Sequence, residues 1–259
     1  MLVSIIIPSR LANSPVEDAL FLDGAIASIR SQTNRANVEI IVGIDTGMTP
    51  PKHLVHQPGL AFVESSGRSQ AAALNAAARL ARGDVIAFLE DDDRWMPAFL
   101  DEALAARDEA DFVSSTQLEV DITGTVTSVV DFPTPSGWLM HRSVWEAVGQ
   151  FDEAFRWHID NQWLGRLAEA GVRRAHLVEA TAPIDPPSRV RQARPWLGRS
   201  IDLSAGHVRL RRHPSPWPLV RRLVHDGSGL SAINRNPTLK KQSQEEYIRL
   251  TERFGRVPW

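Results

Sequence analysis

The chain has 259 residues, a length that suits one α/β domain with a sizeable core or one such domain with a short appendage. Apolar residues make up 43% and charged residues 23%, as in ordinary globular proteins, which argues against wholesale disorder. No cysteine is present, which excludes disulfides, thiolate zinc sites, iron–sulfur clusters and a cysteine nucleophile. Any metal ion must therefore be bound by oxygen or by imidazole.

The net charge of −2 is unevenly distributed along the chain. Residues 1–200 carry 18 basic and 26 acidic side chains, whereas residues 201–259 carry 11 basic and 5 acidic ones. An acidic body does not indicate a nucleic-acid binder, and we expect no nucleic-acid partner. The basic tail suits contact with phosphates or with a membrane surface.

No run of about 18 apolar residues occurs, so we expect no membrane-spanning helix. The apolar start lacks a basic n-region and ends early at Pro8 and Arg10, so it is too short for a signal peptide. The composition favours a cytoplasmic protein, with peripheral contact at the inner face of the membrane as an option.

Strands and helices alternate over the first 110 residues, which predicts a parallel, doubly wound sheet. In chain order we expect a strand at 3–7, a helix at 16–32 capped by Asn13 or Ser14, a strand at 38–44, a loop at 48–59, a strand at 60–63, an alanine-rich helix at 69–81, a strand at 84–89 and a helix at 97–107.

The pattern changes after residue 110. We expect strands at 112–120 and 125–132 around a turn at Gly124, helices near 143–148 and 160–170, a strand near 174–178, and closing helices near 217–225 and 241–254. Residues 181–218 contain seven prolines and show no clear periodicity. Boundaries therefore fall near residues 110 and 200.

Four consecutive acids, Glu90 to Asp93, come directly after a predicted buried strand, at the edge where α/β sheets bind ligands. Like charges this close repel each other unless a cation offsets them, and a hard divalent ion does so. Such an ion can also bind a diphosphate. The alternative is that two acids face solvent and one caps the next helix.

Several other site classes lack their motifs. The sequence has no G-x-x-x-x-G-K-[ST], no G-x-G-x-x-G after the first strand, no H-E-x-x-H and no G-x-S-x-G. A P-loop kinase, an ordinary dinucleotide dehydrogenase, a zincin and an α/β-hydrolase are therefore disfavoured.

The stretch FLEDDDRWMPAFL (88–100) resembles the aspartate motif of glycosyltransferase family 2, which has the GT-A fold. Other segments resemble the family in the same order: VSIIIPSR (3–10), SIRSQT (28–33), EIIVGIDTG (39–47), GRSQAAALNAAARLARGD (67–84), RSVWEAVGQFDEAF (142–155) and WHIDNQWLGRLAEAG (157–171). The resemblance covers roughly residues 3–175, and the C-terminal 60 residues carry none of it.

The resemblance implies an α/β, GT-A-like (Rossmann-like) fold with a mostly parallel sheet flanked by helices and a basic, helical C-terminal extension. Residues 1–110 would form the nucleotide-sugar-binding half and residues 111–200 the acceptor-binding half of the same domain. Residues 201–259 would be the extension, as a lid or as a contact to a membrane or partner. The implied activity is inverting transfer of a sugar, with Mn²⁺ or Mg²⁺, from a nucleotide sugar to the hydroxyl of a sugar, glycan or lipid-linked acceptor. UDP is the favoured nucleotide, and GDP and dTDP remain open.

The resemblance assigns roles within the acidic run. Asp92 aligns with the last acid of D-x-D and is the candidate metal ligand. Glu90 takes the first acid position, near the ribose of the donor, and Asp91 lies between them with the ribose or the metal in reach. Asp93 is expected to be structural and to orient a loop.

Other donor contacts are expected on the first half of the chain. Asp45 aligns with the acid that meets the nucleobase, although a turn residue before Gly47 is an equal alternative. Arg68 would pair with a phosphate or with a carboxylate near the donor, and Arg10 is a similar candidate. Pro8, at the end of the opening strand, belongs to the same donor side.

Asp160 is the candidate general base, because it matches the acceptor-side acid of the family helix. The alternative is that Asp160 caps that helix, and both roles are compatible. Some GT-A enzymes take a histidine metal ligand from the chain after the acceptor region, and His207 is the candidate here. The alternative is a histidine with no ligand role.

Three tryptophans flank these acids, and aromatic faces stack on sugar rings. Trp95, Trp138 and Trp157 are therefore acceptor-side candidates, with ordinary core packing as the alternative. The eight tryptophans of the chain also suit an interface, so a homo-oligomer is an open expectation.

The basic tail segment at 207–225 supports three hypotheses. Arg209, Arg211 or Arg212 could close over the donor diphosphate, or the apolar residues of 217–224 could form an amphipathic helix on an anionic membrane. A solvated basic helix packed on the body is the third.

Two other functions compete with sugar transfer. A sugar-1-phosphate nucleotidyltransferase uses a similar sheet and metal but is expected to carry a glycine-rich basic loop after the first strand, where this chain has PSRLANSP. A non-catalytic nucleotide-sugar-binding protein would keep the acidic run and would not need Asp160.

Overall fold

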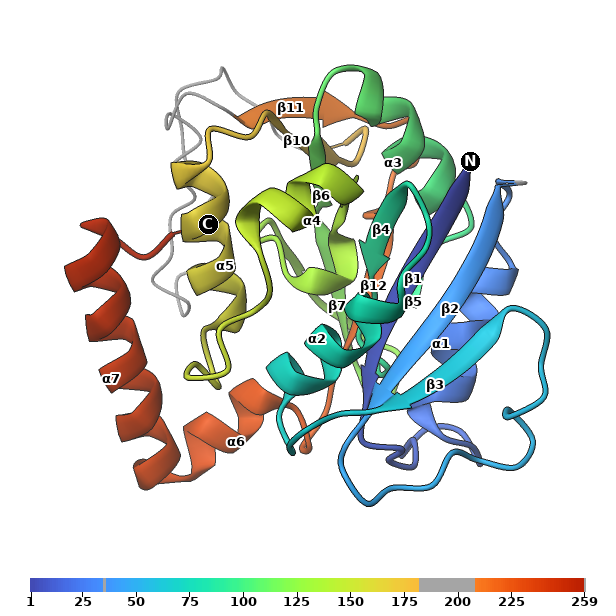
Figure 1. Cartoon of the computed structure of the whole chain (residues 1–259), viewed down its shortest axis with the longest axis horizontal. Helices are drawn as coiled ribbons and strands as arrows, with labels where there is room; N and C mark the ends of the chain where they lie inside the picture. The colour runs from blue at the N-terminus through green and yellow to red at the C-terminus, as the bar shows by residue number, and fades with distance from the viewer. Residues whose placement is uncertain (35, 182–207, 259) are drawn as a thin grey trace.

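The chain is described by a computed structural model that covers residues 1–34, 36–181 and 208–258. Its centre is an eight-stranded sheet (Figure 1). In spatial order the strands are β11 (Val208–Arg212), β10 (Arg174–Val178), β6 (Phe112–Ser115), β9 (Leu139–His141), β4 (Val85–Phe88), β1 (Leu2–Ser9), β2 (Asn37–Ile44) and β3 (Leu60–Glu64). Every neighbouring pair is parallel except the two pairs that β9 makes, with β4 and with β6. The predicted α/β fold with a mostly parallel sheet is confirmed.

Helices cover both faces of this sheet, and each face has its own apolar core. The helices are α1 (Phe21–Arg30), α2 (Gln70–Leu80), α3 (Phe99–Ala105), α4 (Arg142–Val148), α5 (Ile159–Glu169), α6 (Gly229–Arg235) and α7 (Pro237–Phe254), with 3₁₀ turns η1 (Ala106–Asp108) and η2 (Pro135–Gly137). Side chains alternate along the central strand β1: Ile6 packs with α2, α4 and α5, whereas Ile5 and Ile7 pack with α1 and α3. A strand buried on both faces explains why the opening sequence is continuously apolar.

Helix α1 begins later than predicted. Its N-cap is Leu20, whose backbone N–H donates to the Asp23 carboxylate at 3.0 Å, so the expected cap at Asn13 or Ser14 is wrong. The Ser14 hydroxyl instead accepts from the N–H groups of Val16 and Glu17, both at 3.2 Å. A side chain that bonds its neighbouring backbone in this way stabilises a turn in competition with a helix.

Helix α2 lies unusually close to the sheet. A Cβ atom on Gly43 of β2 would stand 2.1 Å from the backbone oxygen of Ala73, so only glycine permits this approach. The hydroxyl of Ser69 accepts from the N–H of Ala72 at 3.1 Å and caps the helix. The close approach brings the N-terminus of α2 to the carboxyl ends of β1, β2 and β4.

A second, four-stranded sheet has the order β5 (Arg94–Trp95), β12 (Val220–Val224), β7 (Gln117–Asp121) and β8 (Val126–Val130). The helix predicted near 217–225 is therefore wrong, because this segment forms β12 between two strands that satisfy its backbone groups. Leu219 and Val220 are fully buried in the core, so they cannot form the apolar face of a membrane-bound helix.

The other end of the basic segment forms the edge strand β11. Arg211 donates to the Glu109 carboxylate at 2.8 Å and Arg209 lies 3.7 Å from it, while Arg212 donates to the carbonyl of Ala180. These contacts hold the three arginines at the edge of the sheet, so the hypothesis that they close over a donor is not supported. Within the described residues, no helix has the length and apolar character needed to cross a membrane.

The chain ends in the predicted helical extension, α6 followed by α7. Helix α7 runs beside α5 at one side of the molecule (Figure 1). A Cβ atom on Gly165 would meet the ring of Phe254 at 2.6 Å, so glycine at this position lets the two helices approach. Leu250 of α7 is fully buried and belongs to the same core as α5.

Glu39 of β2 links both early strands to the connection that follows α2. Its carboxylate accepts from the Ser4 hydroxyl at 2.7 Å, the Arg82 backbone N–H at 2.7 Å and the Arg82 guanidinium at 2.8 Å. Burial alone would raise the pKa of Glu39, but these donors and the charge of Arg82 outweigh it and hold the pKa below its usual value.

We therefore expect Glu39→Gln to lower the free energy of unfolding by about 1–2 kcal/mol at pH 7. A lowered carboxyl pKa contributes stability above the pKa of the unfolded chain and loses it as the pH falls through the folded-state value. The difference between variant and parent, measured by urea titration, should thus shrink progressively as the pH falls from 7 to 3. A difference that is constant from pH 7 to pH 3 would contradict this account.

Candidate active site

The carboxyl ends of β1, β2 and β4 meet at one edge of the main sheet, and a cavity of about 450 Å³ opens there. Its wall combines this edge with β7, β8, β12 and the helices α5, α6 and α7. Nine of the residues predicted from the sequence line it: Pro8, Arg10, Asp45, Arg68, Glu90, Asp91, Asp92, Trp157 and Asp160. Segments far apart in the chain therefore contribute to one cavity.

Two predicted acceptor-side residues are core residues instead. Trp95 is 2% exposed, stacks on Phe99 with ring centroids 4.3 Å apart and donates its indole N–H to the carbonyl of Ser136. Trp138 is fully buried and donates to the carbonyl of Pro133 at 3.0 Å. The expectation for these two is wrong because large aromatic side chains contribute most to stability inside the core. His207 lies outside the described residues.

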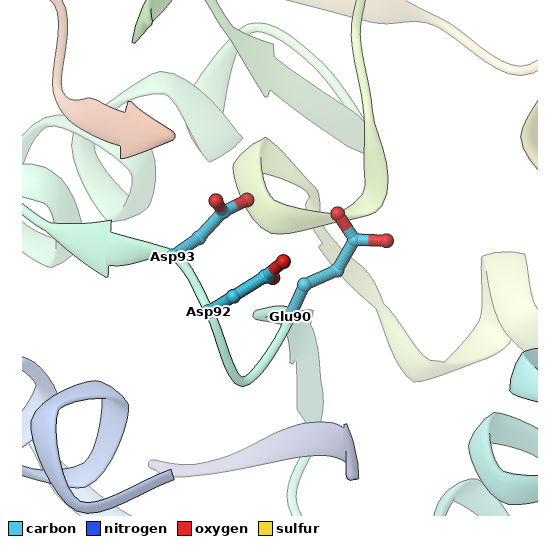
Figure 2. Close-up of side chains that lie close together, drawn as sticks. All are labelled: Glu90, Asp92 and Asp93. Carbon is cyan, nitrogen blue, oxygen red and sulfur yellow. The ribbon is translucent and has the colours of Figure 1, made fainter. Parts of the chain in front are cut away.

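The acidic run forms a tight turn directly after β4. The backbone N–H of Asp93 donates to the carbonyl of Glu90 at 3.1 Å, which closes the turn. Figure 2 shows the side chains of Glu90, Asp92 and Asp93 extending to the same side of this turn. One carboxylate oxygen from each of the three lies within 4.8 Å of the others.

Two of the four acids are anchored to neighbouring elements. Asp91 accepts from the hydroxyl of Ser9 at the end of β1, at 2.6 Å. Asp93 is 1% exposed and accepts from the Ser136 hydroxyl at 2.5 Å and from the Leu223 N–H at 3.3 Å. Asp93 thus binds the η2 turn and strand β12 to the acidic turn, as its predicted structural role requires.

Burial and mutual repulsion disfavour the ionised form of three of the four carboxyl groups in this turn. Burial raises the pKa of Glu90 to about 7, and the charges of Asp92 and Asp160 add to the effect. Burial and Asp92 likewise raise the pKa of Asp91 to about 7 and hold that of Asp93 well above its usual value. Buried carboxylates with raised pKa values are typical of ligand and metal sites.

Two further residues, which were not predicted from the sequence, come from β12 and the turn that follows it. Arg222 faces the acidic turn and lies 3.6 Å from the Glu119 carboxylate, and the charges of Asp93, Glu90 and Glu119 raise its pKa against the effect of burial. His225 places its Nε2 3.0 Å from the Asp92 carboxylate, with its ring 4.7 Å from that of Phe21. The sequence signal for both is weak, because residues 219–224 carry four apolar residues around two arginines before an Asp-Gly turn, a pattern that fits a helix as well as a strand.

These residues fit a hard divalent cation. Three carboxylate oxygens converge, their mutual repulsion is offset only in part by Arg222, and an imidazole stands beside Asp92. Carboxylate oxygens are the ligands that Mg²⁺ and Mn²⁺ prefer, and Mn²⁺ also accepts imidazole. Glu90, Asp92 and Asp93, with His225 beside them, are the residues that would hold the ion.

Asp160 lies in the first turn of α5, on the other side of the cavity from the end of β1. The N-cap of α5 is His158, so the alternative of Asp160 as the N-cap residue is wrong. One Asp160 oxygen accepts from the N–H of Asn161 at 2.8 Å. Its charge contributes to the raised pKa of Glu90, and both carboxylates line the same cavity.

The remaining predicted residues surround this pair. Arg10 and Arg68 are exposed at the cavity mouth, and the Arg10 guanidinium reaches the carbonyl of Gly227 at 3.5 Å. Asp45 follows β2, and its carbonyl accepts from the N–H of Met48 at 3.1 Å. Trp157 is partly exposed, and the guanidinium of Arg156 lies 4.9 Å from its ring centroid.

Comparisons with solved structures agree with the fold. The structure of S. aureus TarS 1–349 in complex with UDP matches with a TM-score of 0.57 and 11% identity over 97% of this chain and 72% of that one. The complex with UDP-GlcNAc matches with a TM-score of 0.55 and 12% identity over 88% of this chain and 60% of that one. S. aureus TarS itself matches with a TM-score of 0.54 and 11% identity, over 87% and 37% of the two chains. At such identities the likeness concerns the fold, and the chain spans between 37% and 72% of the length of these structures.

No curated protein sequence matches the chain. The model of the family described as "Glycosyl transferase family 2" matches residues 4–153, more than half of the chain. The matched part includes the acidic turn and every donor-side residue predicted from the sequence. The chain therefore belongs to glycosyl transferase family 2.

Proposed function

We propose that the chain transfers a sugar from a nucleoside diphosphate sugar to an acceptor hydroxyl, with inversion at the anomeric carbon and with Mn²⁺ or Mg²⁺ bound. One observation carries the proposal: a single cavity joins the acidic turn after β4 to Asp160 on α5. The solved structures that resemble this chain are named as complexes with UDP and with UDP-GlcNAc, which supports a uridine nucleotide as donor here.

The donor occupies the side of the cavity built by β1, β2 and the N-terminus of α2. Asp45 contacts the nucleobase, and Arg10 and Arg68 bind the diphosphate from the cavity mouth. Exposed guanidinium groups at this position support the assignment, because Arg binds phosphate oxygens in bidentate fashion. Asp91 and Glu90 lie next to the ribose.

The leaving group carries two phosphates into the region of highest negative charge. A divalent cation bound there supplies electrostatic stabilisation for the departing diphosphate. The protein contributes fixed carboxylates that need no rearrangement, since Asp93 is held by Ser136 and Asp91 by Ser9. Arg222 offsets part of the remaining charge from the β12 side.

Asp160 is the general base. The acceptor oxygen attacks the anomeric carbon as its proton passes to the Asp160 carboxylate, and the bond from the anomeric carbon to the diphosphate oxygen breaks. One displacement of this kind inverts the configuration and needs no covalent nucleophile. The absence of cysteine from the sequence is compatible with that.

The acceptor occupies the side of the cavity between β8, Trp157 and the C-terminal helices. Its lining there includes Phe132, Trp157, Ile233 and Leu239, which offer an apolar and aromatic wall beside Asp160. A sugar ring stacks on such a wall through its C–H face while its hydroxyl meets the base.

We expect Asp92→Asn to abolish metal-dependent stabilisation. In the parent at pH 8, where Glu90 and Asp91 are ionised, saturating Mn²⁺ should raise the unfolding temperature by roughly 5–10 °C over EDTA, the equivalent of about 2.7 kcal/mol. In the variant that shift should vanish. Without metal the variant should be as stable as the parent or more so, because Asp92 contributes to the raised pKa of three neighbouring acids.

The matched control is Asp108→Asn, which removes the same charge from an exposed position on η1. It should keep the full Mn²⁺ shift. Equal shifts in Asp92→Asn and the parent would remove Asp92 from the metal site.

We expect Asp160→Asn to lower the turnover number for UDP release from UDP-GlcNAc by about 100-fold or more. UDP with Mn²⁺ should stabilise this variant as it does the parent, because Asp160 faces the acceptor. Asp152→Asn is the control, since Asn retains the oxygen that accepts from the Ala154 N–H. Full activity in Asp160→Asn would overturn the base assignment. No stabilisation of the parent by UDP, GDP, CDP or dTDP, with either metal, would indicate a fold relative that binds no nucleotide.

A further inference from the structure

The C-terminal helix α7 contacts the segment that carries the proposed base. This helix lies beyond residues 4–153, the part that matches the family model. It runs beside α5 (Figure 1). Both helices contribute residues to the lining of the cavity. The contact between them is made by polar groups as well as by the apolar core.

Glu246 is the centre of this contact. It is 6% exposed, on a helix whose surface is otherwise mostly charged and solvated. One carboxylate oxygen accepts from the backbone N–H of Arg156 at 2.8 Å, and the other accepts from those of Trp157 at 2.8 Å and His158 at 3.0 Å. A charged acceptor makes each of these bonds roughly twice as strong as a neutral one.

The three N–H groups lead directly into α5, whose N-cap is His158 and whose cap makes no side-chain hydrogen bond of its own. The N–H of His158 is one of the backbone donors at the start of α5 that the helix itself leaves without a partner, and Glu246 binds it from a different helix, as the N3 side chain of a capping box does locally. The negative charge of Glu246 also lies at the N-terminal end of α5, where the helix dipole favours an anion.

Neighbouring bonds hold the same segment from the same side. The ring of His158 lies with Nε2 3.0 Å from the Ser243 hydroxyl of α7 and with Nδ1 3.1 Å from the Asn161 side-chain oxygen. Asn161 donates to the carbonyl of Pro258 at 2.6 Å. The residues on both sides of Asp160 are thus tied to the C-terminal segment.

Burial of a carboxylate is costly, and an apolar side chain would hold α7 on the core at lower cost. Leu250, one turn further along the same face, already does so. The carboxylate differs from an apolar side chain because its three hydrogen bonds fix the backbone of residues 156–158 in one orientation.

We propose that Glu246 is a positioning residue for the transfer reaction: it fixes the backbone of residues 156–158 and thereby sets Asp160 and Trp157 against the acceptor. This inference rests on the proposed function. It gives the C-terminal extension a role in catalysis without any contact to the substrate. A misplacement of about 1 Å in such a base costs up to about 100-fold in rate.

Glu246→Gln is the test, because it keeps the shape and removes one of the two acceptor oxygens. The NH₂ group of the new glutamine must face either the N–H of Arg156 or the N–H groups of Trp157 and His158. Because both groups are donors, the hydrogen bonds on that side are lost. We expect the turnover number for UDP release from UDP-GlcNAc to fall about 10- to 100-fold, with the Michaelis constant for the donor unchanged. Amide hydrogen exchange in the peptide over 154–162 should become faster, and stabilisation by UDP with Mn²⁺ should stay as in the parent.

Two controls separate positioning from stability. Glu245→Gln removes the same charge from the neighbouring exposed residue, whose carboxylate lies 3.9 Å from Lys241 of its own helix, and should match the parent in every measurement. Leu250→Ala weakens the packing of α7 without touching the carboxylate. It should lower the unfolding temperature at least as much as Glu246→Gln and keep the turnover number within about 3-fold of the parent.

The outcomes divide clearly. A turnover number in Glu246→Gln equal to that of the parent, or a fall in Leu250→Ala as large as in Glu246→Gln, would overturn the positioning role. If Glu246→Gln does not fold, Glu246→Asp takes its place, since it keeps the charge and withdraws the carboxylate by one methylene; it should show the same slowed turnover with donor binding intact. Full activity in Asp160→Asn would refute the base itself, which is a failure of the proposed function and is seen independently of Glu246.

Discussion

The crowding of four carboxylates in one turn is the constraint on which the rest of the site depends. Strand β4 ends at Phe88, and only Leu89 separates it from the run Glu90 to Asp93 at the edge of the sheet. Burial and mutual repulsion raise the pKa of three of them, so the turn is costly unless other groups stabilise it. Separate elements do so. The hydroxyls of Ser9 and Ser136 donate hydrogen bonds to two of the acids, and β12 contributes the guanidinium of Arg222. The geometry of the active site follows from how this one turn is held.

Contacts within the protein account for part of the uneven distribution of charge along the sequence. The basic tail was expected to serve as a lid, as a contact for phosphate or membrane, or as a solvated basic helix packed on the body. In the structure Arg222 faces the acidic turn, and Arg209 and Arg211 pair with Glu109 at the edge of the sheet. Positive charge at the end of the chain thus offsets negative charge in its body. A local excess of one sign in a sequence is a statement about an outside partner only when the fold leaves it exposed.

Most of the sheet could be predicted from the sequence, because buried parallel strands such as residues 3–7 and 84–89 are short apolar runs that precede turn residues. The acids predicted for the donor side come to one cavity for the same reason, since they lie at strand ends. The β12 segment could not be assigned, because its five residues, three apolar residues flanking two adjacent arginines, fit a helix as well as a strand. Its place between β5 and β7 decides for the strand. His225 was missed with it. Trp95 and Trp138 were wrongly predicted to face the acceptor. A tryptophan close to an acid in the sequence can face either a cavity or the core, and these two are buried in the core.

The part of the chain that matches the family model and the part that follows it line different sides of the cavity. Residues 4–153 build the acidic turn and the ends of β1 and β2, which the donor side needs. Asp160, Trp157 and the helices α6 and α7 come after that boundary and form the opposite wall of the cavity. Most of this wall is therefore built by chain outside the family match, and the same part of the chain returns β12 to the acidic turn. Strand β12 places the first part of the C-terminal segment beside the acidic turn. Further along, Glu246 of α7 accepts three N–H bonds from residues 156–158. The same segment therefore contacts the acidic turn at one side of the cavity and holds the backbone next to Asp160 at the other.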